Sequence, residues 1–446
     1  MSKLLLCNAR LVNDGKIRDA DVLIDGERIA NVSASIAAPS GASVIDLAGK
    51  YLLPGMIDDQ VHFREPGMTH KGDLATESAA AVAGGITSFM DMPNVSPQTT
   101  TRAALRDKYS IAKNRCTANY GFHFGATNTN IEEIKALQVG EAAGIKAFMG
   151  ASTGDMLIDD SAALERLFEH APVIILTHCE DSPTIWKNEA RAREKFGEQV
   201  PISEHPAIRS AEACLLSSTL AVDLASRHDA LLHILHLTTA IEMGLFSNAH
   251  RSEKRITAEV CVHHLWFDES RYDQLGAKIK CNPAIKTAAD REALIAALNE
   301  QRIDVIATDH APHTASEKAT HYFKSPAGLP LVQHALLTLF DLATDGQINV
   351  ELIVDRACHA PADIFGVADR GYVREGWYAD LVIVDPDSPY RVEQSNLLSK
   401  CQWSPFEGHE YSACIDTTIV NGNVVYSDGS LTGNIAGQKL EFGRAR

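Results

Sequence analysis

Histidine and aspartate residues stand at the ends of several short apolar runs in this sequence. His62 ends MIDDQVH, His178 ends VIILTH, His236 ends LLHILH and Asp309 ends DVIATD. A single histidine after an apolar run is more often a core residue than a ligand. Imidazole and carboxylate groups that meet at one place are the ligand set of zinc and similar divalent ions. The sequence therefore predicts a metal site if the fold brings these four run ends together.

Lys146 lies in a further run of this kind, GIKAFMG. An ammonium group beside a divalent ion is repelled, so the side chain must point away or lose its charge. A neutral lysine amine can capture CO₂ and become a carbamate, which carries a carboxylate that can bridge two ions. The other interpretation is a strand lysine whose ammonium group extends to solvent. The residues alone leave both interpretations open.

Eight short apolar runs, most of them followed by helix-like segments, occupy the middle of the chain. The expected strands are MIDDQVHF, ITSFMDMP, NYGFHFGA, IKAFMG, VIILTHCE, LLHILHLTT, RITAEVCV and DVIATDH, and the expected helices include DLATESAAAVAGG, SAALERLFEH and AIEMGLFSNAH. This alternation predicts an α/β fold, a (β/α)8 barrel of the TIM type. A doubly wound open sheet is the alternative, because periodicity does not reveal closure. The barrel is favoured because polar residues gather at the C-terminal strand ends, where such barrels carry out catalysis.

The two ends of the chain have a different pattern. Short β-rich runs bounded by Asn, Gly and Asp occur near the start (LLLCNARLV, DVLID, SVIDL) and near the end (ADLVIVD, TTIVNG, NVVYSDG). Such runs are typical of hairpins, and chain termini commonly lie close together. We expect a small composite β domain from residues 1–53 and 367–446, the latter including a tail. Residues 54–366 would form the metal-dependent barrel.

Composition limits the partners and the compartment. The chain has 446 residues, of which 45% are hydrophobic, enough for a large core. Its formal net charge of −17, from 41 Lys and Arg against 58 Asp and Glu, repels nucleic acid and anionic membranes. Nine cysteines without a CxxC pair favour a reducing compartment, and no run approaches the ~18 apolar residues of a membrane span. We expect a cytoplasmic protein that acts on a small molecule.

Several motifs together resemble one known family. DDQVHFREPG is followed in order by GGITSFMDMPN, GIKAFMG, ILTHCE, HILHLTT, AEVCVHHL, KCNPAIK, TDHAPH and SPAGLP. Over nearly the whole chain this series resembles the dihydroorotases of the amidohydrolase superfamily, in the group with the REPG signature. The resemblance implies a cyclic amide hydrolase. Its reaction would be the reversible closure of N-carbamoyl-L-aspartate to (S)-dihydroorotate plus water, in de novo pyrimidine biosynthesis.

The resemblance also implies roles for individual residues. Two zinc ions would be held by His62, Lys146, His178, His236 and Asp309, with a carboxylated Lys146 shared between them. Asp309 would in addition be the catalytic general acid and base. The implied substrate-binding residues are Arg64, Asn94, Asn282, His313, Ala327 and Gly328. A guanidinium group suits the substrate carboxylate because it forms charge-assisted hydrogen bonds in a fixed orientation.

One position departs from the family pattern. The metal motif His-x-His-x-Arg reads Gln60, Val61, His62, Phe63, Arg64 in this chain. Gln60 could be a metal ligand through its amide oxygen, which is a poorer zinc ligand than imidazole. It could instead form hydrogen bonds to the ligands. We expect the first ion, at His62 and Asp309, to be held more weakly than the second, at His178 and His236.

Two other functions are open to a chain of this kind. An allantoinase-like or hydantoinase-like enzyme would share the metal ligands, although the allantoinase pattern lacks the arginine found at Arg64. An inactive scaffold partner of aspartate carbamoyltransferase would have lost several ligands together, whereas this chain keeps five. An active dihydroorotase is therefore favoured. The resemblance further implies a homodimer, and an association with aspartate carbamoyltransferase is compatible with it.

Overall fold

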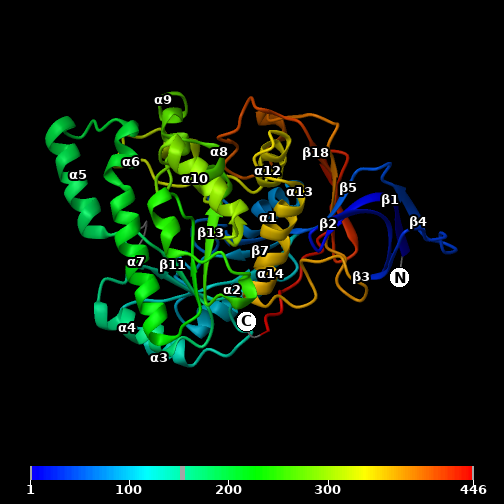
Figure 1. Cartoon of the computed structure of the whole chain (residues 1–446), viewed down its shortest axis with the longest axis horizontal. Coiled ribbons are helices and arrows are strands. Elements are labelled where there is room, and N and C mark those ends of the chain that lie inside the picture. The colour runs from blue at the N-terminus through cyan, green and yellow to red at the C-terminus, as the bar shows by residue number, and fades with distance from the viewer. Residues whose placement is uncertain (1–2, 151–155, 444–446) are drawn as a thin grey trace.

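The computed structural model describes residues 3–150 and 156–443 of the chain. A barrel surrounded by helices forms the larger part, and a sheet built from both ends of the chain lies beside it (Figure 1). In the view of Figure 1 the blue N-terminal strands and the red C-terminal ones meet at the right. Within the described residues, no helix combines the length and the apolar character that crossing a membrane requires.

Eight parallel strands form the barrel in chain order. They are β6 (Met56–Val61), β7 (Ile86–Asp91), β8 (Asn119–Phe122) continued by β9 (Phe124–Gly125), β10 (Ile145–Phe148), β11 (Ile175–His178), β12 (Leu232–Ile234), β13 (Ile256–Cys261) and β14 (Val305–Ala307). Pairing runs from β6 to β8 and from β9 to β14. Closure comes from a bridge between Val61 and His310, beside which the N–H of His62 donates to the His310 carbonyl over 2.7 Å. The predicted (β/α)8 barrel is confirmed, and the open-sheet alternative is wrong.

Helices cover the outside of the barrel. They are α1 (Leu74–Ala83), α2 (Arg102–Ala112), α3 (Ile131–Lys135), α4 (Ser161–His170), α5 (Ser182–Phe196), α6 (His205–Ile208), α7 (Ala211–His228), α8 (Val262–Trp266), α9 (Tyr272–Leu275), α10 (Ala288–Asn299), α11 (Ala315–Lys318), α12 (Ala335–Thr344), α13 (Val350–Val354) and α14 (Ala360–Phe365). The sequence sets the bounds of α1: the Asp73 side chain accepts from the backbone N–H groups of Ala75 and Thr76, and Gly84 follows its last turn. The helices expected at 73–85 and 161–170 are α1 and α4.

The prediction of a third helix, at 240–250, is wrong. The chain forms only the short 3-10 helix η2 (Ala240–Leu245) there. The buried Glu242 side chain accepts hydrogen bonds from the hydroxyls of Ser218 and Thr239. These bonds hold the segment against α7, and Gly244 disfavours propagation of an α-helix.

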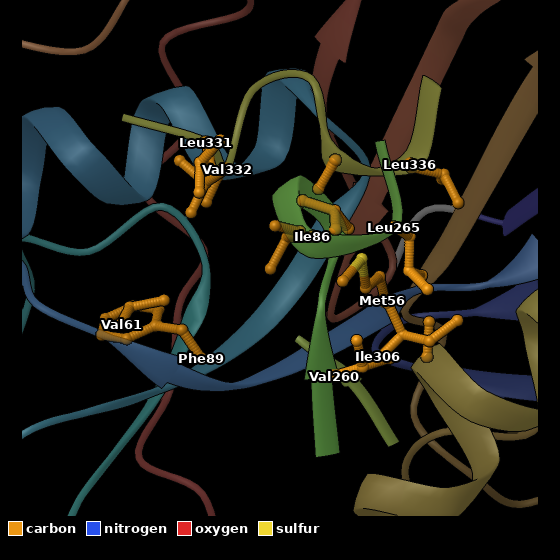
Figure 2. Packing of buried hydrophobic residues seen from close by; sticks show 14 of the residues in the cluster. Met56, Val61, Ile86, Phe89, Val260, Leu265, Ile306, Leu331, Val332 and Leu336 are labelled. Carbon is orange, nitrogen blue, oxygen red and sulfur yellow. The ribbon is translucent and has the colours of Figure 1, made fainter. Parts of the chain in front are cut away.

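The hydrophobic core lies between the barrel strands and the layer outside them. Figure 2 shows part of it: Met56, Val61, Ile86, Phe89, Val260 and Ile306 from barrel strands, packed with Leu265, Leu331, Val332 and Leu336. All ten are at most 1% exposed. Because burying one such side chain stabilises the fold by about 1.5–3 kcal/mol, this packing holds the strand ends in fixed positions.

Both ends of the chain contribute to one nine-stranded sheet. Its strands are β1 (Lys3–Asn13), β2 (Lys16–Asp25), β3 (Arg28–Ser33), β4 (Ser43–Asp46), β5 (Tyr51–Pro54), β15 (Leu381–Asp385), β18 (Cys414–Val420), β19 (Asn423–Ser427) and β20 (Ser430–Leu431). The seam is the antiparallel pairing of β5 with β15, in which Leu381 lies opposite Pro54 and Val384 opposite Tyr51. The expected composite β domain is thereby confirmed.

The chain after β15 also contacts the barrel. Strands β16 (Tyr390–Arg391) and β17 (Glu410–Tyr411) form a separate ladder, and the tail returns to β8, where the N–H of Leu440 donates to the Tyr120 carbonyl over 2.8 Å. The boundaries 1–53, 54–366 and 367–446 remain predictions. Residues 1–2 and 444–446 of the outer segments lie outside the described residues.

Candidate active site

One pocket at the C-terminal mouth of the barrel is lined by all twelve residues that the sequence singled out. The lining consists of Gln60, His62, Arg64, Asn94, Lys146, Phe148, His178, His236, Asn282, Asp309, Ala311, His313, Ala327 and Gly328. Phe148 and Ala311 are the two that sequence reasoning missed. The barrel accounts for this gathering, because the ends of its parallel strands meet at a single mouth.

His62 and Asp309 face each other across the pocket. His62 Nε2 lies 3.0 Å from Asp309 Oδ1, and His62 Nδ1 lies 2.8 Å from Asn94 Oδ1. An amide oxygen can only accept, so Asn94 places the ring hydrogen on Nδ1 and leaves Nε2 toward the carboxylate. Asn94, expected to contact substrate, thus contacts a predicted ligand. An outer partner that orients a histidine in this way is typical of metal sites.

Gln60 contacts the same carboxylate through its amide nitrogen. Its Nε2 donates to Asp309 Oδ1 over 3.2 Å, and its Oε1 lies 3.8 Å from the Cys261 thiol. The oxygen that could serve as a metal ligand therefore points away from Asp309. This arrangement favours the hydrogen-bonding role for Gln60 over the ligand role.

His178 and His236 bring two ring nitrogens together on the other side of the pocket. Nδ1 of His178 lies 3.0 Å from Nε2 of His236. The outer nitrogen of His178, Nε2, lies 3.0 Å from Glu180 Oε2, which also pairs with Arg209. Burial raises the pKa of Glu180, but Arg209 and His178 outweigh it and lower that pKa to about 2, so the carboxylate stays charged. Glu180 was missed, although a carboxylate directly after the apolar ILTHC run was a usable signal.

Lys146 lies inside the pocket wall and does not extend to solvent. It is 1% exposed, and within the described part of the chain its Nζ has no hydrogen-bond partner and lies 4.7 Å from the Phe148 ring centroid. Burial lowers the pKa of Lys146 to about 8, although Asp309 and Glu259 act in the opposite direction. The solvent-exposed interpretation is therefore wrong. A buried amine with this pKa is partly neutral at physiological pH, which is the form that captures CO₂.

Arg64 and His313 form the opposite, cationic wall. Arg64 Nε donates to the Pro312 carbonyl over 3.1 Å, and its terminal nitrogen lies 3.1 Å from His313 Nε2. Burial lowers the pKa of Arg64 to about 10, which leaves it charged at neutral pH. His313 Nε2 donates to the Ala327 carbonyl over 3.0 Å, so its Nδ1 accepts from Lys71 Nζ over 3.1 Å. Lys71 was missed because it lies 242 positions from its partner.

The segment with Ala327 and Gly328 is fixed by contacts with Ala311 and Lys318. Gly328 has a φ of +139°, and a Cβ there would lie 2.4 Å from the Ala311 carbonyl oxygen, so only glycine fits. The buried Lys318 Nζ donates to the carbonyls of Lys280, Pro326 and Gly328 at 2.9–3.1 Å. The segment is therefore held in one position against the pocket.

Two further features are typical of binding sites. Asn282 Oδ1 is buried and has no hydrogen-bond partner among the residues the structure describes, so it can accept from a ligand N–H. Arg64, His236 and Asp309 have positive φ values of 70°, 40° and 50°. This conformation costs about 1–2 kcal/mol in residues other than glycine and collects at functional sites.

Comparisons with known proteins agree with this geometry. The profile of the amidohydrolase family matches residues 51–425. The dihydroorotase of Halobacterium salinarum is 34% identical over 436 residues, which cover 96% of this chain and 97% of that protein. The dihydroorotase of Methanosarcina acetivorans is 32% identical over 443 residues, 97% of this chain and 93% of that one.

Solved structures of related enzymes are similar over the full length. The L-hydantoinase (dihydropyrimidinase) from Arthrobacter aurescens has a TM-score of 0.93 at 25% identity, covering 99% of this chain and 100% of that chain. The dihydropyrimidinase from Brevibacillus agri has a TM-score of 0.91 at 24% identity and full coverage of both chains. At 24% identity, the similarity to the Brevibacillus agri enzyme shows only that the two chains share a fold.

Proposed function

The chain belongs to the amidohydrolase family, in the group of the dihydroorotases, and we propose that it interconverts N-carbamoyl-L-aspartate and (S)-dihydroorotate. The observation that carries the proposal is the position of Arg64, a buried cation on the same pocket as the five predicted metal ligands. A cyclic amide that bears a carboxylate satisfies both sides of such a pocket. Charge-assisted hydrogen bonds to the guanidinium hold the carboxylate, and the ring amide faces the ligands.

The donor set fits two divalent ions, which we propose to be zinc. His62 and Asp309 would hold the first ion, and His178 and His236 would hold the second. A carboxylated Lys146 would be a ligand of both ions. His62 Nε2 and Asp309 Oδ1 are two electron-pair donors 3.0 Å apart, an arrangement that a cation between them stabilises. When bound, such ions lower the pKa of water toward ~7 and polarise a carbonyl group.

The remaining chemistry belongs to side chains of the pocket. Burial raises the pKa of Asp309, but the neighbouring His62, His263 and Lys146 side chains outweigh burial and lower that pKa, so the carboxylate is ionised and has a free electron pair for a proton. In the ring-opening direction Asp309 takes a proton from the attacking water and delivers it to the amide nitrogen as the C–N bond breaks. In ring closure the same carboxylate takes the proton from the ureido nitrogen as the C–N bond forms, and delivers it to the oxygen that leaves as water.

The substrate is oriented by residues on the far side of the pocket. Arg64 binds its carboxylate, His313 lies beside the guanidinium on the same wall, and the orphaned Asn282 Oδ1 accepts from a ring N–H. Fixing the ring in this way converts a bimolecular encounter into attack at a set geometry. A neutral ring, as in hydantoin, would leave the Arg64 charge unpaired and would bind less well.

Turnover tests the proposal directly. Protein purified without chelators and supplied with zinc is assayed on dihydroorotate, N-carbamoyl-L-aspartate, allantoin and hydantoin. We expect interconversion of the first two and kcat/KM values at least about 100-fold lower for the other rings. Equal or better turnover of hydantoin would assign the pocket to a different ring substrate. No turnover of any of the four, by protein with metal bound, would favour the scaffold function.

The proposal extends to a homodimer in the cytoplasm. All nine cysteines are free thiols, which agrees with a reducing compartment. Light scattering of the protein as it elutes from a size-exclusion column measures its mass in solution, and a homodimer has twice the 48.4 kDa of one chain. Co-elution with aspartate carbamoyltransferase from the same organism tests whether the two enzymes associate.

A further inference from the structure

A second cluster of ligand-type side chains lies inside the barrel, beneath the pocket. Asp59 of β6, His233 of β12 and Glu259 of β13 direct atoms to one point, all within 4.8 Å of one another. Each of the three residues is 0% exposed. Asp59 directly precedes Gln60 and His233 lies three residues before His236, so the cluster is deeper in the barrel than the pocket lining. The proposed reaction uses none of the three.

The ring of His233 has the orientation of a metal ligand. Its Nδ1 lies 2.7 Å from the Thr257 hydroxyl oxygen, and that hydroxyl donates its own hydrogen to the Leu232 carbonyl over 3.3 Å. Thr257 can therefore only accept from His233, which places the ring hydrogen on Nδ1. In the neutral ring the Nε2 lone pair then faces the carboxylates of Asp59 and Glu259. Three electron-pair donors that face one another require a cation between them.

The distances fit a shared ion better than direct hydrogen bonds. His233 Nε2 lies 3.4 Å from Asp59 Oδ2 and 3.6 Å from Glu259 Oε2. A charge-assisted hydrogen bond would bring these atoms to about 2.7–2.9 Å. Ligands that surround a tetrahedral zinc ion at about 2.0–2.1 Å lie about 3.3–3.4 Å from one another. The spacing in the cluster is close to this second value.

Most of the polar atoms in the cluster have no hydrogen-bond partner in the part of the chain that the structure describes. Both Asp59 carboxylate oxygens, His233 Nε2 and Glu259 Oε2 are buried without a hydrogen-bond partner among the residues described here. In the described part of the chain, the ion pairs of Asp59 and Glu259 involve His233 alone, and no lysine or arginine. The other oxygen of Glu259, Oε1, is already occupied because it accepts from the N–H of His236. Buried carboxylates in this state are strongly unfavourable unless a cation compensates them.

We propose that Asp59, His233 and Glu259 bind a divalent transition-metal ion such as Zn²⁺, in addition to the two ions proposed for the pocket. One dication neutralises the two carboxylates and accepts the histidine lone pair. The ion ties β6 to β12 and β13 across the barrel interior. Through Glu259 it also holds the backbone N–H of His236, so the buried ion supports a ligand of the pocket.

A proton is the competing occupant. Burial lowers the pKa of His233, but Asp59 and Glu259 outweigh burial and raise it to about 9, so without an ion the ring would be an imidazolium. An imidazolium would donate from Nε2 to one carboxylate and shorten that contact. A metal ion and a proton therefore differ in geometry and in anomalous scattering.

Anomalous diffraction distinguishes the two occupants. Crystals of the full chain, purified without chelators and grown with Zn²⁺, are measured above and below the zinc absorption edge. We expect a peak about 2 Å from Asp59, His233 and Glu259, separate from any peak at the pocket. A cluster without an anomalous peak would overturn the proposal, whatever its N–O distances and whatever the pocket contains. The location of each peak keeps this test independent of the test of the pocket ions.

Metal content of two isosteric variants gives a second readout. Asp59→Asn removes a ligand of the cluster, and we expect it to bind one zinc ion fewer per chain than the wild type. Asp58→Asn is the matched control, because this adjacent buried carboxylate bonds to Thr308 and lies outside the cluster. Equal metal content in the wild type and both variants would contradict the proposal. Should Asp59→Asn fail to fold, the wild-type anomalous map alone decides.

Discussion

At the scale of single residues, each of three pocket histidines has its outer nitrogen held by a partner. Asn94 holds His62, Glu180 holds His178 and Lys71 holds His313. Asn94 and Lys71 fix the tautomers of their rings, and Glu180 lies against the ring of His178 as an ion-pair partner. The histidines and Arg64 could be found from the sequence because they stand in short motifs. Glu180 directly follows one of these motifs and could have been found in the same way, whereas Lys71 acts only through a contact made by the fold.

The position of Gln60 leads to a prediction about metal affinity. Gln60→His places an imidazole where an amide nitrogen now faces Asp309, so we expect the first ion to bind at least about tenfold more tightly. Titration of zinc into the apo-protein, followed by calorimetry, measures the two affinities. Gln60→Leu, which removes the hydrogen bond and adds no ligand, serves as the control. Two ions of equal, tight affinity in the wild type would contradict the weak first site.

The state of Lys146 leads to a prediction about CO₂. If the buried amine must become a carbamate to hold both ions, zinc reconstitution of the apo-protein should be faster and more complete in bicarbonate than in CO₂-free buffer. Lys146→Arg keeps a cation but cannot form the carbamate. We therefore expect this variant to bind fewer zinc ions and to reconstitute equally with and without bicarbonate. Bicarbonate-independent reconstitution of the wild type would count against the carbamate.

At the scale of elements, strands were easier to predict than the segments between them. The eight barrel strands are short, apolar and bounded by polar residues, so their pattern is local and the sequence contains it. The segment at 240–250 also looks helical, but the hydroxyls of Ser218 and Thr239 hold Glu242 in a short 3-10 turn. The loop at 326–328 was assigned by resemblance, while its support by a buried lysine depends on packing.

That support predicts the effect of removing the lysine. Lys318→Met takes the donor away from three carbonyls of the loop region, so we expect KM for dihydroorotate to rise severalfold while kcat changes little. Leaving buried carbonyls unsatisfied should also lower the free energy of unfolding by about 2 kcal/mol or more. Steady-state kinetics and urea titrations measure the two effects. Lys324→Met, at an exposed position nearby, is the control, and an equal effect there would contradict the role of Lys318.

At the scale of the whole molecule, a strongly acidic chain concentrates cations where an anion is expected to bind. The formal net charge is −17, yet Arg64, Lys71 and Lys318 lie at or beneath one side of the pocket. The closed barrel and the β5–β15 seam follow from patterns spread along the whole sequence. Which buried groups stay uncharged depends on burial, which the sequence does not give.

Buried neutral histidines predict loss of stability in acid. Burial lowers the pKa of His334 to about 3, against 6.5 in the unfolded chain. The unfolded state therefore gains a proton first as pH falls below 6.5, and this group's contribution to stability, complete above 6.5, is lost as pH falls toward 3. The slope is about 1.4 kcal/mol per pH unit.

Urea titrations at pH 7.5 and 5.5 measure this effect. Over that interval we expect the free energy of unfolding to fall by about 1 kcal/mol less in His334→Phe than in the wild type. A substitution at His70, which is exposed, controls for the loss of a histidine as such. Parallel losses in the wild type and His334→Phe would show that His334 does not titrate in this way.

The most direct test of the central claim, that Arg64 anchors the carboxylate of a cyclic amide substrate, is kcat/KM for two rings. Dihydroorotate and dihydrouracil differ by that carboxylate alone. For the wild type we expect a strong preference for dihydroorotate. For Arg64→Met we expect a loss of about 100-fold, or about 3 kcal/mol, on dihydroorotate and little change on dihydrouracil. Equal losses on both rings, or a wild type that prefers dihydrouracil, would contradict the account.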